Sequence, residues 1–184
     1  MFKMRVEISK LIDVWEKRFA RPLTQWGISI TRSQRHDEKM NYYVWRLYPN
    51  PLGREDTFHY TFVIAKLKPD EILIENQEHC DVFPESEIAN IWSAFFGRAR
   101  EVASEVILLK LFQPLVLHNI IPEAYSREIT FMDSDGQILR LSFIFSGHNC
   151  FILKNRRGVA VKIEPTDIQD LAQQIVRVCS LMLL

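Results

Sequence analysis

The chain has 184 residues, of which 47% are hydrophobic and 25% are charged. This composition is ordinary for a folded globular protein and excludes a chain that is disordered throughout. The 23 basic and 23 acidic residues cancel, so the net charge provides no general attraction to nucleic acid or to a membrane surface. Any charged partner must therefore be recognised by a local patch of side chains.

The three cysteines, Cys80, Cys150 and Cys179, are widely spaced and odd in number. This argues against a disulfide framework and favours a reducing compartment. The N-terminal segment lacks the uninterrupted apolar stretch of a signal peptide, and no apolar run approaches the ~20 residues of a membrane-spanning helix. We therefore expect an intracellular, cytoplasmic protein with no membrane partner.

Residues 1–26 predict an N-terminal amphipathic helix, because their apolar residues recur on one helical face. Residues 27–113 predict a first unit of sheet and helix. Its runs ISITRS, YYVWRLY, TFHYTFVIAKL and EILIE are rich in β-branched and aromatic residues, as strands are. Alternation in the third run places the even-numbered residues of 58–64 on one buried face. A long helical pattern follows, and we expect Pro114 to end it.

Residues 114–127 predict a connector that is apolar enough to be packed, and residues 128–184 predict a second unit. The strand-like runs of this unit are REITFMD, QILRLSFIF, CFILKN and GVAVKI, and a final helix follows Pro165. The expected fold class is α+β within a single globular domain. An N-terminal helix precedes two units, each an antiparallel four-stranded sheet plus a helix, and the two units share one core.

Two segments of the chain resemble each other, which predicts an internal duplication. ILIENQEHCDVFPESEIANI at 72–91 aligns with FILKNRRGVAVKIEPTDIQDL at 151–171. Each segment has an apolar strand ending in asparagine (Asn76, Asn155), a turn, a second strand, a proline (Pro84, Pro165) and a helix. Chance similarity between two strand–turn–helix segments is the other explanation, and the sequence leaves both open.

The second segment resembles the single-stranded-nucleic-acid-binding fold of PC4-like coactivators. The match runs from Arg156-Arg157-Gly158 through the strand 159–161 to Pro165 and the following helix, with two extra residues before the proline. In PC4-like proteins two chains supply the sheet–helix units, whereas one chain carries both units in Whirly proteins and the related mitochondrial guide-RNA-binding proteins. The resemblance implies curved sheets that bind single strands. The first unit departs from it, because residues 71–87 contain six acids and no Lys or Arg.

Binding of a single strand requires cations along the phosphates and aromatic faces that stack on bases. The candidate residues are the cations Lys154, Arg156, Arg157, Lys162, Arg140 and Arg46, with Tyr42 and Tyr48 as stacking partners. Tyr43 and Trp45, on the opposite face of the same strand, are an alternative pair. Core packing is the expectation for Trp45, Phe58 and Phe62, and a solvated hairpin tip also explains the arginine pair.

No motif predicts catalysis, a cofactor or a metal site. His79-Cys80 and His148/Cys150 offer zinc-type ligands but lack the spacing of a zinc motif, and no cysteine has the context of an activated thiolate. We expect a non-enzymatic protein that binds single-stranded DNA or RNA. The alternative is a protein–protein interaction module, such as an adaptor, chaperone-like or assembly subunit, without nucleic-acid binding. The apolar end VCSLMLL favours a protein partner or a homo-oligomer in either case.

Overall fold

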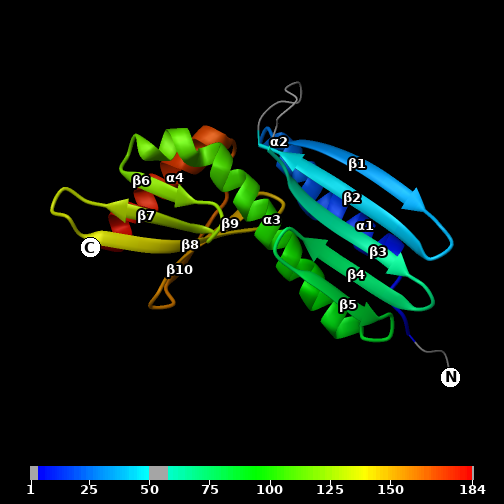
Figure 1. Ribbon diagram of the computed structural model, residues 1–184. Coiled ribbons are helices and arrows are strands. Elements are labelled where there is room, and N and C mark those ends of the chain that lie inside the picture. The colour runs from blue at the N-terminus through cyan, green and yellow to red at the C-terminus, as the bar shows by residue number, and fades with distance from the viewer. Residues whose placement is uncertain (1–3, 50–57, 184) are drawn as a thin grey trace.

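The computed structural model describes residues 4–49 and 58–183 of the chain, which form two antiparallel sheets and the helices that cover them (Figure 1). The first sheet has the order β1-β2-β3-β4-β5 and the second has the order β10-β9-β8-β7-β6. Both are meanders, in which each strand pairs with the next along the chain. The N-terminal helical segment consists of α1 (Ile8–Trp15), a π-helical turn (Glu16–Ala20) and α2 (Arg21–Gln25).

Each sheet is followed by a helix. The strands of the first sheet are β1 (Ser29–His36), β2 (Met40–Tyr48), β3 (Tyr60–Leu67), β4 (Glu71–Asn76) and β5 (Cys80–Pro84), and α3 (Ile88–Val116) follows. The strands of the second sheet are β6 (Ile120–Glu123), β7 (Glu128–Met132), β8 (Ile138–Gly147), β9 (Cys150–Asn155) and β10 (Ala160–Ile163), and α4 (Ile168–Leu183) follows. None of the helices in the described part of the chain combines the length and apolar composition needed to cross a membrane.

The predicted α+β class and the N-terminal helix are confirmed, but the expected strand count is wrong, since each sheet has five strands rather than four. The strand missing from the predicted second unit is β6, which lies within residues 114–127, where a connector was expected. Its Pro122 weakens the strand pattern in the sequence. A proline is nevertheless tolerated here, because β6 is an edge strand that pairs only with β7.

Helix α3 connects the two sheets and packs against both of them (Figure 1). It continues through Pro114 to Val116 instead of ending before the proline. A surface helix buries one face, whereas residues 102–108 of α3 are all buried. The middle of α3 is therefore enclosed on every side, and this makes it a shared core element of both units.

The core is continuous across the two units, as predicted. Trp15 of α1 stacks on Phe62 of β3 with ring centroids 4.1 Å apart. Phe19 meets Phe145 of β8 edge to face at 6.2 Å, and Trp26 meets Phe151 of β9 at 5.2 Å. The N-terminal helical segment thus packs against the second sheet as well as the first, and its aromatic residues bind the two sheets into one core.

The two segments that resemble each other in sequence occupy similar places in the two sheets. Asn76 ends β4 and Asn155 ends β9, and each side chain closes the following hairpin turn. The Asn76 Oδ1 accepts from the backbone N–H groups of residues 78 and 79 at 3.0 and 2.9 Å. The Asn155 Oδ1 accepts from those of residues 157 and 159, both at 3.0 Å. The second turn is one residue longer and uses Gly158 at φ 86°.

Candidate functional site

Each sheet has one face packed on helices and one outer face. In the view of Figure 1, α1 lies behind the first sheet and α4 behind the second, so the outer faces of both sheets are turned toward the reader. Residues that are paired across strands share a face. The odd-numbered residues 141, 143 and 145 of β8 are buried on the inner face, which leaves its even-numbered residues on the outer face.

Three of the predicted cations lie together on the outer face of the second sheet. Lys154 pairs with Ser142, the residue two positions from Arg140 on β8. Lys162 of β10 pairs with Ile152, two positions from Lys154 on β9. Its ammonium is held by Glu164 at 2.6 Å, and this contact raises the pKa of Lys162. Lys162 is therefore already paired with an acid, and a phosphate would compete with Glu164 for it.

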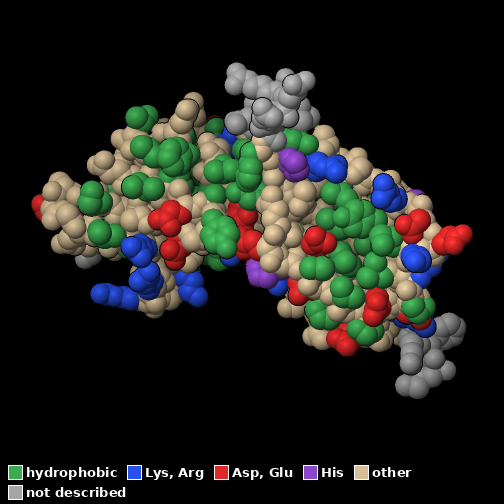
Figure 2. All heavy atoms as spheres, in the orientation of Figure 1, with side chains coloured by type: hydrophobic (Ala, Val, Ile, Leu, Met, Phe, Trp, Pro, Cys, Tyr) green, Lys and Arg blue, Asp and Glu red, His purple; other side chains and the backbone are tan. Residues whose placement is uncertain are grey.

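Arg156 and Arg157 are exposed at the tip of the β9–β10 hairpin, beside Lys154. We call Arg140, Lys154, Arg156 and Arg157 the basic surface. Of the ion pairs formed by the described residues, none involves these four side chains. Figure 2 shows Lys and Arg side chains gathered over this hairpin.

The other predicted residues lie on the first sheet. Tyr42, Arg46 and Tyr48 share the outer face of β2, as the alternation predicts, and all three are half-buried. The Arg46 Nη1 donates to the Ser33 hydroxyl at 3.3 Å, and the Tyr48 ring lies 5.2 Å from that of His59. Burial, assisted by the charge of Glu75, raises the pKa of Tyr42. In Figure 2, acidic and hydrophobic side chains lie between β2 and the β9–β10 hairpin, so the predicted cations do not form one continuous track.

The expectation of core packing is confirmed for two of the three aromatic residues. Trp45 and Phe62 are fully buried against Trp15. Phe58 is instead 58% exposed, because it lies before the first residue of β3, where the strand alternation does not apply. The alternative stacking partner Trp45 is thereby removed from solvent, and its indole N–H donates to Glu16 Oε1 at 2.7 Å.

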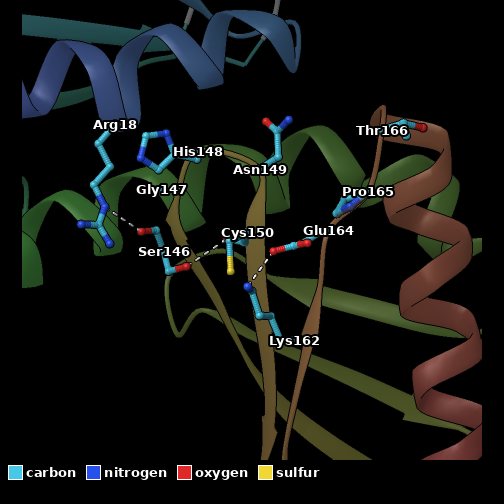
Figure 3. Close-up of a pocket in the computed structure, with 10 residues that line it drawn as sticks. All are labelled: Arg18, Ser146, Gly147, His148, Asn149, Cys150, Lys162, Glu164, Pro165 and Thr166. Atoms are coloured by element: carbon cyan, nitrogen blue, oxygen red, sulfur yellow. Dashed lines mark hydrogen bonds and ion pairs between the residues drawn. The ribbon is translucent and has the colours of Figure 1, made fainter.

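A hollow of about 740 Å³ lies at one end of the outer face of the second sheet (Figure 3). The Ser146 hydroxyl donates to the backbone oxygen of Cys150 at 3.2 Å, and the Lys162–Glu164 pair forms another wall. Arg18 reaches in from the N-terminal helical segment and donates from Nε to the backbone oxygen of Ser146 at 3.2 Å. Its guanidinium also lies over the Phe96 ring, 5.0 Å from the centroid. These contacts join the two halves of the molecule, and Arg18 has a structural role in them.

Two of the three cysteines, Cys80 and Cys179, do not have the surroundings of reactive thiols. Burial raises the pKa of Cys179 to about 12. Burial, together with Glu75 and Asp81, also raises the pKa of Cys80. An activated thiolate requires the opposite shift. In residues 4–49 and 58–183, no group of three or more His, Cys, Asp or Glu side chains is placed to hold a metal ion.

An exposed apolar surface lies where α3 ends and the second sheet begins. Val116, Ile121, Met132 and Ile138 are 41%, 53%, 52% and 61% exposed. Together with Asn119 and Thr130 they line a hollow of about 240 Å³ that contains no charged side chain. We call these six residues the apolar surface. Single exposed aliphatic side chains are common, but several around one hollow are typical of an interaction site.

A group of charged side chains at the junction of the two units was not predicted. Arg127, from the β6–β7 turn, donates to Glu105 Oε1 of α3 at 2.6 Å and to Glu78 Oε2 of the β4–β5 turn at 3.3 Å. One helical turn earlier, Glu101 accepts from Arg98 at 2.9 Å and from Asn76 at 2.8 Å. We call Glu78, Arg98, Glu101, Glu105 and Arg127 the junction cluster.

Burial has a large effect on the junction cluster. It raises the pKa of Glu105 to about 7, although the hydrogen bond from Arg127 acts in the opposite direction. It also raises the pKa of Tyr60 to about 12, with Glu105 and Glu78 adding to the effect. The only signal in the sequence is that Glu105 stands alone in the apolar helical run 102–109. Its partners come from turns far away in the chain.

Comparisons of this chain with protein-family models, curated proteins and solved structures find no match.

Proposed function

We propose that this protein is a non-enzymatic protein–protein interaction module, such as an adaptor, a chaperone-like protein or an assembly subunit. The observation that supports this most strongly is the apolar surface. Four large side chains that are 41–61% exposed surround one uncharged hollow. Complete removal of one such side chain from water contributes about 1.5–3 kcal/mol. A partner that covers all four would gain a substantial part of the roughly 8 kcal/mol that corresponds to micromolar affinity.

The charge distribution also favours a protein partner. The chain is neutral overall, and the cations that were predicted to bind nucleic acid are divided between two sheets. Non-specific binding of nucleic acid depends mainly on neutralising several phosphates along one path. A neutral surface on which apolar and basic side chains adjoin, as Thr130 and Arg140 do as paired residues of β7 and β8, is better suited to a partner that presents complementary groups of both kinds.

Binding of single-stranded nucleic acid is the second candidate, and the basic surface supports it. Four cations without acidic partners among the described residues lie on one hairpin and its sheet, and two of them, Arg156 and Arg157, belong to the segment that resembles PC4-like proteins. Each phosphate contact adds about 0.7 to the slope of log affinity against log salt for single strands. Four contacts would therefore give a slope of about −3, with the second unit contributing nearly all of it.

Two charge-altering double variants separate the candidates. Ile121→Lys/Ile138→Lys disrupts the apolar surface, and Arg156→Glu/Arg157→Glu reverses the basic surface. Circular dichroism first establishes that both variants are folded. Affinity capture from cells of the source organism, quantified by mass spectrometry, is then compared with fluorescence anisotropy of a labelled single-stranded oligonucleotide at two salt concentrations.

The protein-interaction proposal predicts a partner that the lysine variant loses and the glutamate variant retains. It is wrong if both variants capture the same proteins as the unaltered chain. The nucleic-acid candidate predicts salt-dependent anisotropy that only the glutamate variant loses. Oligonucleotide binding that does not change with salt, or its absence at low salt, would exclude that candidate.

A further inference from the structure

An open hollow of about 520 Å³ lies at the junction of the two units. It is separate from both the basic and the apolar surface. Residues from β3 and the segment before it, the β4–β5 turn, α3 and the β6–β7 turn line it. Its walls are Phe58, Tyr60, Leu109, Ala124 and Tyr125, and its polar lining is Gln77, Glu78 and Glu105. The site therefore combines an apolar wall with two carboxyl groups of the junction cluster.

The carboxyl groups of this hollow outnumber the cations that face them. Glu78 and Glu105 share one guanidinium, that of Arg127. The neighbouring Arg98 is already bound by Asp81 at 2.7 Å and Glu101 at 2.9 Å. The four carboxyl groups thus face two guanidiniums, and the His79 ring lies 4.0 Å from Glu78 and 3.4 Å from Glu101. The Glu105 side chain is only 5% exposed, so solvent does little to stabilise its negative charge.

One carboxylate oxygen in the hollow is unsatisfied. Glu78 Oε1 is buried and has no hydrogen-bond partner among the described residues. A buried acceptor without a donor is rare in folded proteins and costs roughly 1–3 kcal/mol. A ligand that brings N–H donors and a positive charge would satisfy this oxygen and balance the excess of carboxylates at the same time.

The aromatic walls favour the same class of ligand. Phe58 and Tyr60 pack edge to face with centroids 5.1 Å apart, and Tyr125 is 80% exposed. The face of an aromatic ring attracts ammonium and guanidinium groups, and such contacts contribute about 0.5–2 kcal/mol. Alkyl carbons attached to the cation would pack against Leu109. A bare metal ion would gain nothing from these walls, because it prefers a cage of oxygen ligands.

We propose that this hollow binds an organic cation, either an ammonium or a guanidinium group with an alkyl stem. The cation lies between the carboxyl groups of Glu78 and Glu105, and its stem packs against the aromatic walls. Two sources share this chemistry: a free alkylamine or alkylguanidine, and a Lys or Arg side chain of a partner polypeptide. This site stands independently of the protein-interaction proposal, since a small cation would bind without any partner protein.

The protonation of Glu105 should make this binding depend on pH. The groups that face Glu105 are Tyr60 of β3, Glu78 of the β4–β5 turn, Glu101 of α3 and Arg127 of the β6–β7 turn, while His79 and Arg98 contact Glu101. The pKa of Glu105 lies at about 7, so raising the pH from 6 to 8 ionises its carboxyl. A bound cation favours the ionised form, and its affinity should therefore increase about tenfold over this interval.

The test uses n-butylammonium and N-ethylguanidinium as probes, with the neutral isosteres 1-butanol and N-ethylurea as controls. Binding is followed by NMR chemical-shift changes and by the increase in melting temperature that a bound ligand produces. The expected result is at least tenfold preference for the cations, shifts confined to the hollow, and affinity that rises with pH. Equal binding of cations and isosteres, or no binding of the cations, would overturn the proposal.

Three variants show whether the site is correctly placed. Glu105→Gln should reduce cation affinity at least tenfold and remove its dependence on pH. Tyr125→Ala, at an exposed turn position that does not support the core, should reduce affinity three- to tenfold without affecting the fold. Glu38→Gln removes one carboxylate from the exposed β1–β2 turn and should change nothing. If Tyr125→Ala and Glu105→Gln both bind as tightly as the unaltered chain, the cation does not occupy this hollow.

A second pair of probes identifies the source of the cation. A short apolar peptide with one central arginine is compared with the same peptide carrying citrulline, which has the same shape without the charge. Binding of the arginine peptide at least tenfold more tightly than N-ethylguanidinium assigns the site to a side chain of a partner. Equal affinity assigns it to a free small cation. Equal binding of the arginine and citrulline peptides contradicts the proposal in both forms.

Discussion

Glu105 contributes to stability in a direction that is unusual for a carboxyl group. Its pKa in the folded protein is about 7, above its ordinary value of 4.5, so the folded state holds the proton more tightly than the unfolded state. The tighter proton binding of Glu105 in the folded state stabilises the protein fully below about pH 4.5, and this stabilisation is lost as the pH rises through about 7. Each pKa unit corresponds to 1.36 kcal/mol, which sets an upper limit of about 3.5 kcal/mol.

We predict that Glu105→Gln flattens the dependence of stability on pH, because glutamine cannot ionise. Urea unfolding at pH 5, 6, 7 and 8 measures the free energy of unfolding for both chains. The unaltered chain should lose up to about 2–3 kcal/mol relative to the variant between pH 5 and pH 8. A constant difference between the two chains across this range would contradict the assigned pKa.

Gly147 lies at a contact between the two halves of the molecule, and substituting it tests that contact. This glycine is the last residue of β8, with φ 99°, and a methyl group on it would overlap Cγ of Arg18. The neighbouring His148 N–H donates to the backbone oxygen of Arg18 at 2.7 Å, so the helical segment cannot easily move away. Gly136 is the matched control, because it has φ 79° but no atom within 4 Å of an added methyl group.

We predict that Gly147→Ala destabilises the fold by about 2–4 kcal/mol and Gly136→Ala by about 1 kcal/mol. Both variants place an alanine at a left-handed backbone position, and only Gly147→Ala also clashes with the Arg18 side chain. Urea unfolding of the two variants measures the difference. Equal costs would mean that Arg18 moves aside freely and that this contact does not hold the N-terminal helical segment against the second sheet.

Single residues also show where strand alternation succeeds and where it fails. The buried positions of β3 and the shared outer face of Tyr42, Arg46 and Tyr48 were predictable, because alternation is a local property of a strand. The exposure of Phe58 was not, since it depends on where pairing with β2 ends. The partners of Glu105 were also beyond prediction, because Glu78 and Arg127 come from turns that only tertiary packing brings to α3.

Among the elements, α3 has the greatest effect on the architecture, and one of its polar residues links it to the second sheet. The Ser104 hydroxyl donates to the backbone oxygen of Arg100 at 2.6 Å and accepts from the buried N–H of Phe145 in β8 at 2.9 Å. The hydrogen bond from the Phe145 N–H to the Ser104 hydroxyl interrupts neither helix nor sheet. It is a polar contact between the enclosed part of α3 and β8, within packing that is otherwise apolar.

We predict that Ser104→Ala destabilises the protein by about 1–3 kcal/mol, because the Phe145 N–H then has no acceptor. Ser93→Ala, at an exposed position of the same helix, should stay within about 0.5 kcal/mol of the unaltered chain. Hydrogen exchange of the Phe145 amide gives a second measurement and should accelerate in Ser104→Ala. Unchanged exchange and unchanged stability would show that water replaces the serine.

The elements also show how far local patterns reach. The long helix, the β-rich runs and the closing helix were predictable from periodicity and turn residues. β6 was missed because a four-residue strand containing proline has too little pattern to stand out. The end of α3 was missed for a related reason, since Pro114 suggests a stop, whereas the packing of Leu115 in the core extends the helix beyond it.

In the whole molecule, the repeated order of sheet and helix was predictable, and so was a shared core. The relative placement of the two sheets was not, because it rests on contacts such as Phe19–Phe145 and Trp26–Phe151 between residues more than a hundred positions apart. The junction cluster depends on this placement, because Glu78 comes from a turn of the first sheet and Arg127 from a turn of the second. Arg46 lies on the first sheet and the other predicted cations on the second, which explains why a list of cations from the sequence suggested a longer track than the fold provides.

The shared core leads to a prediction about cooperativity. Trp15, Trp26, Trp45 and Trp92 all belong to the first half of the chain, and of these Trp26 contacts Phe151 of the second sheet, so tryptophan fluorescence reports mainly on the first half. Ile129 of β7 is fully buried in the second sheet. Because α3 and the aromatic contacts join the two sheets, we expect both units to unfold in one transition.

Ile129→Val removes one buried methyl group and should cost about 0.5–1.5 kcal/mol. In a single cooperative unit, this cost must lower the urea midpoint seen by tryptophan fluorescence as much as the midpoint seen by circular dichroism. Val44→Ala on the outer face of the first sheet serves as the reciprocal variant and should likewise move both midpoints together. If Ile129→Val leaves the fluorescence transition in place while circular dichroism shifts, the two units unfold separately. The enclosed helix α3 would then fail to couple them, and a ligand at the junction could not stabilise both halves at once.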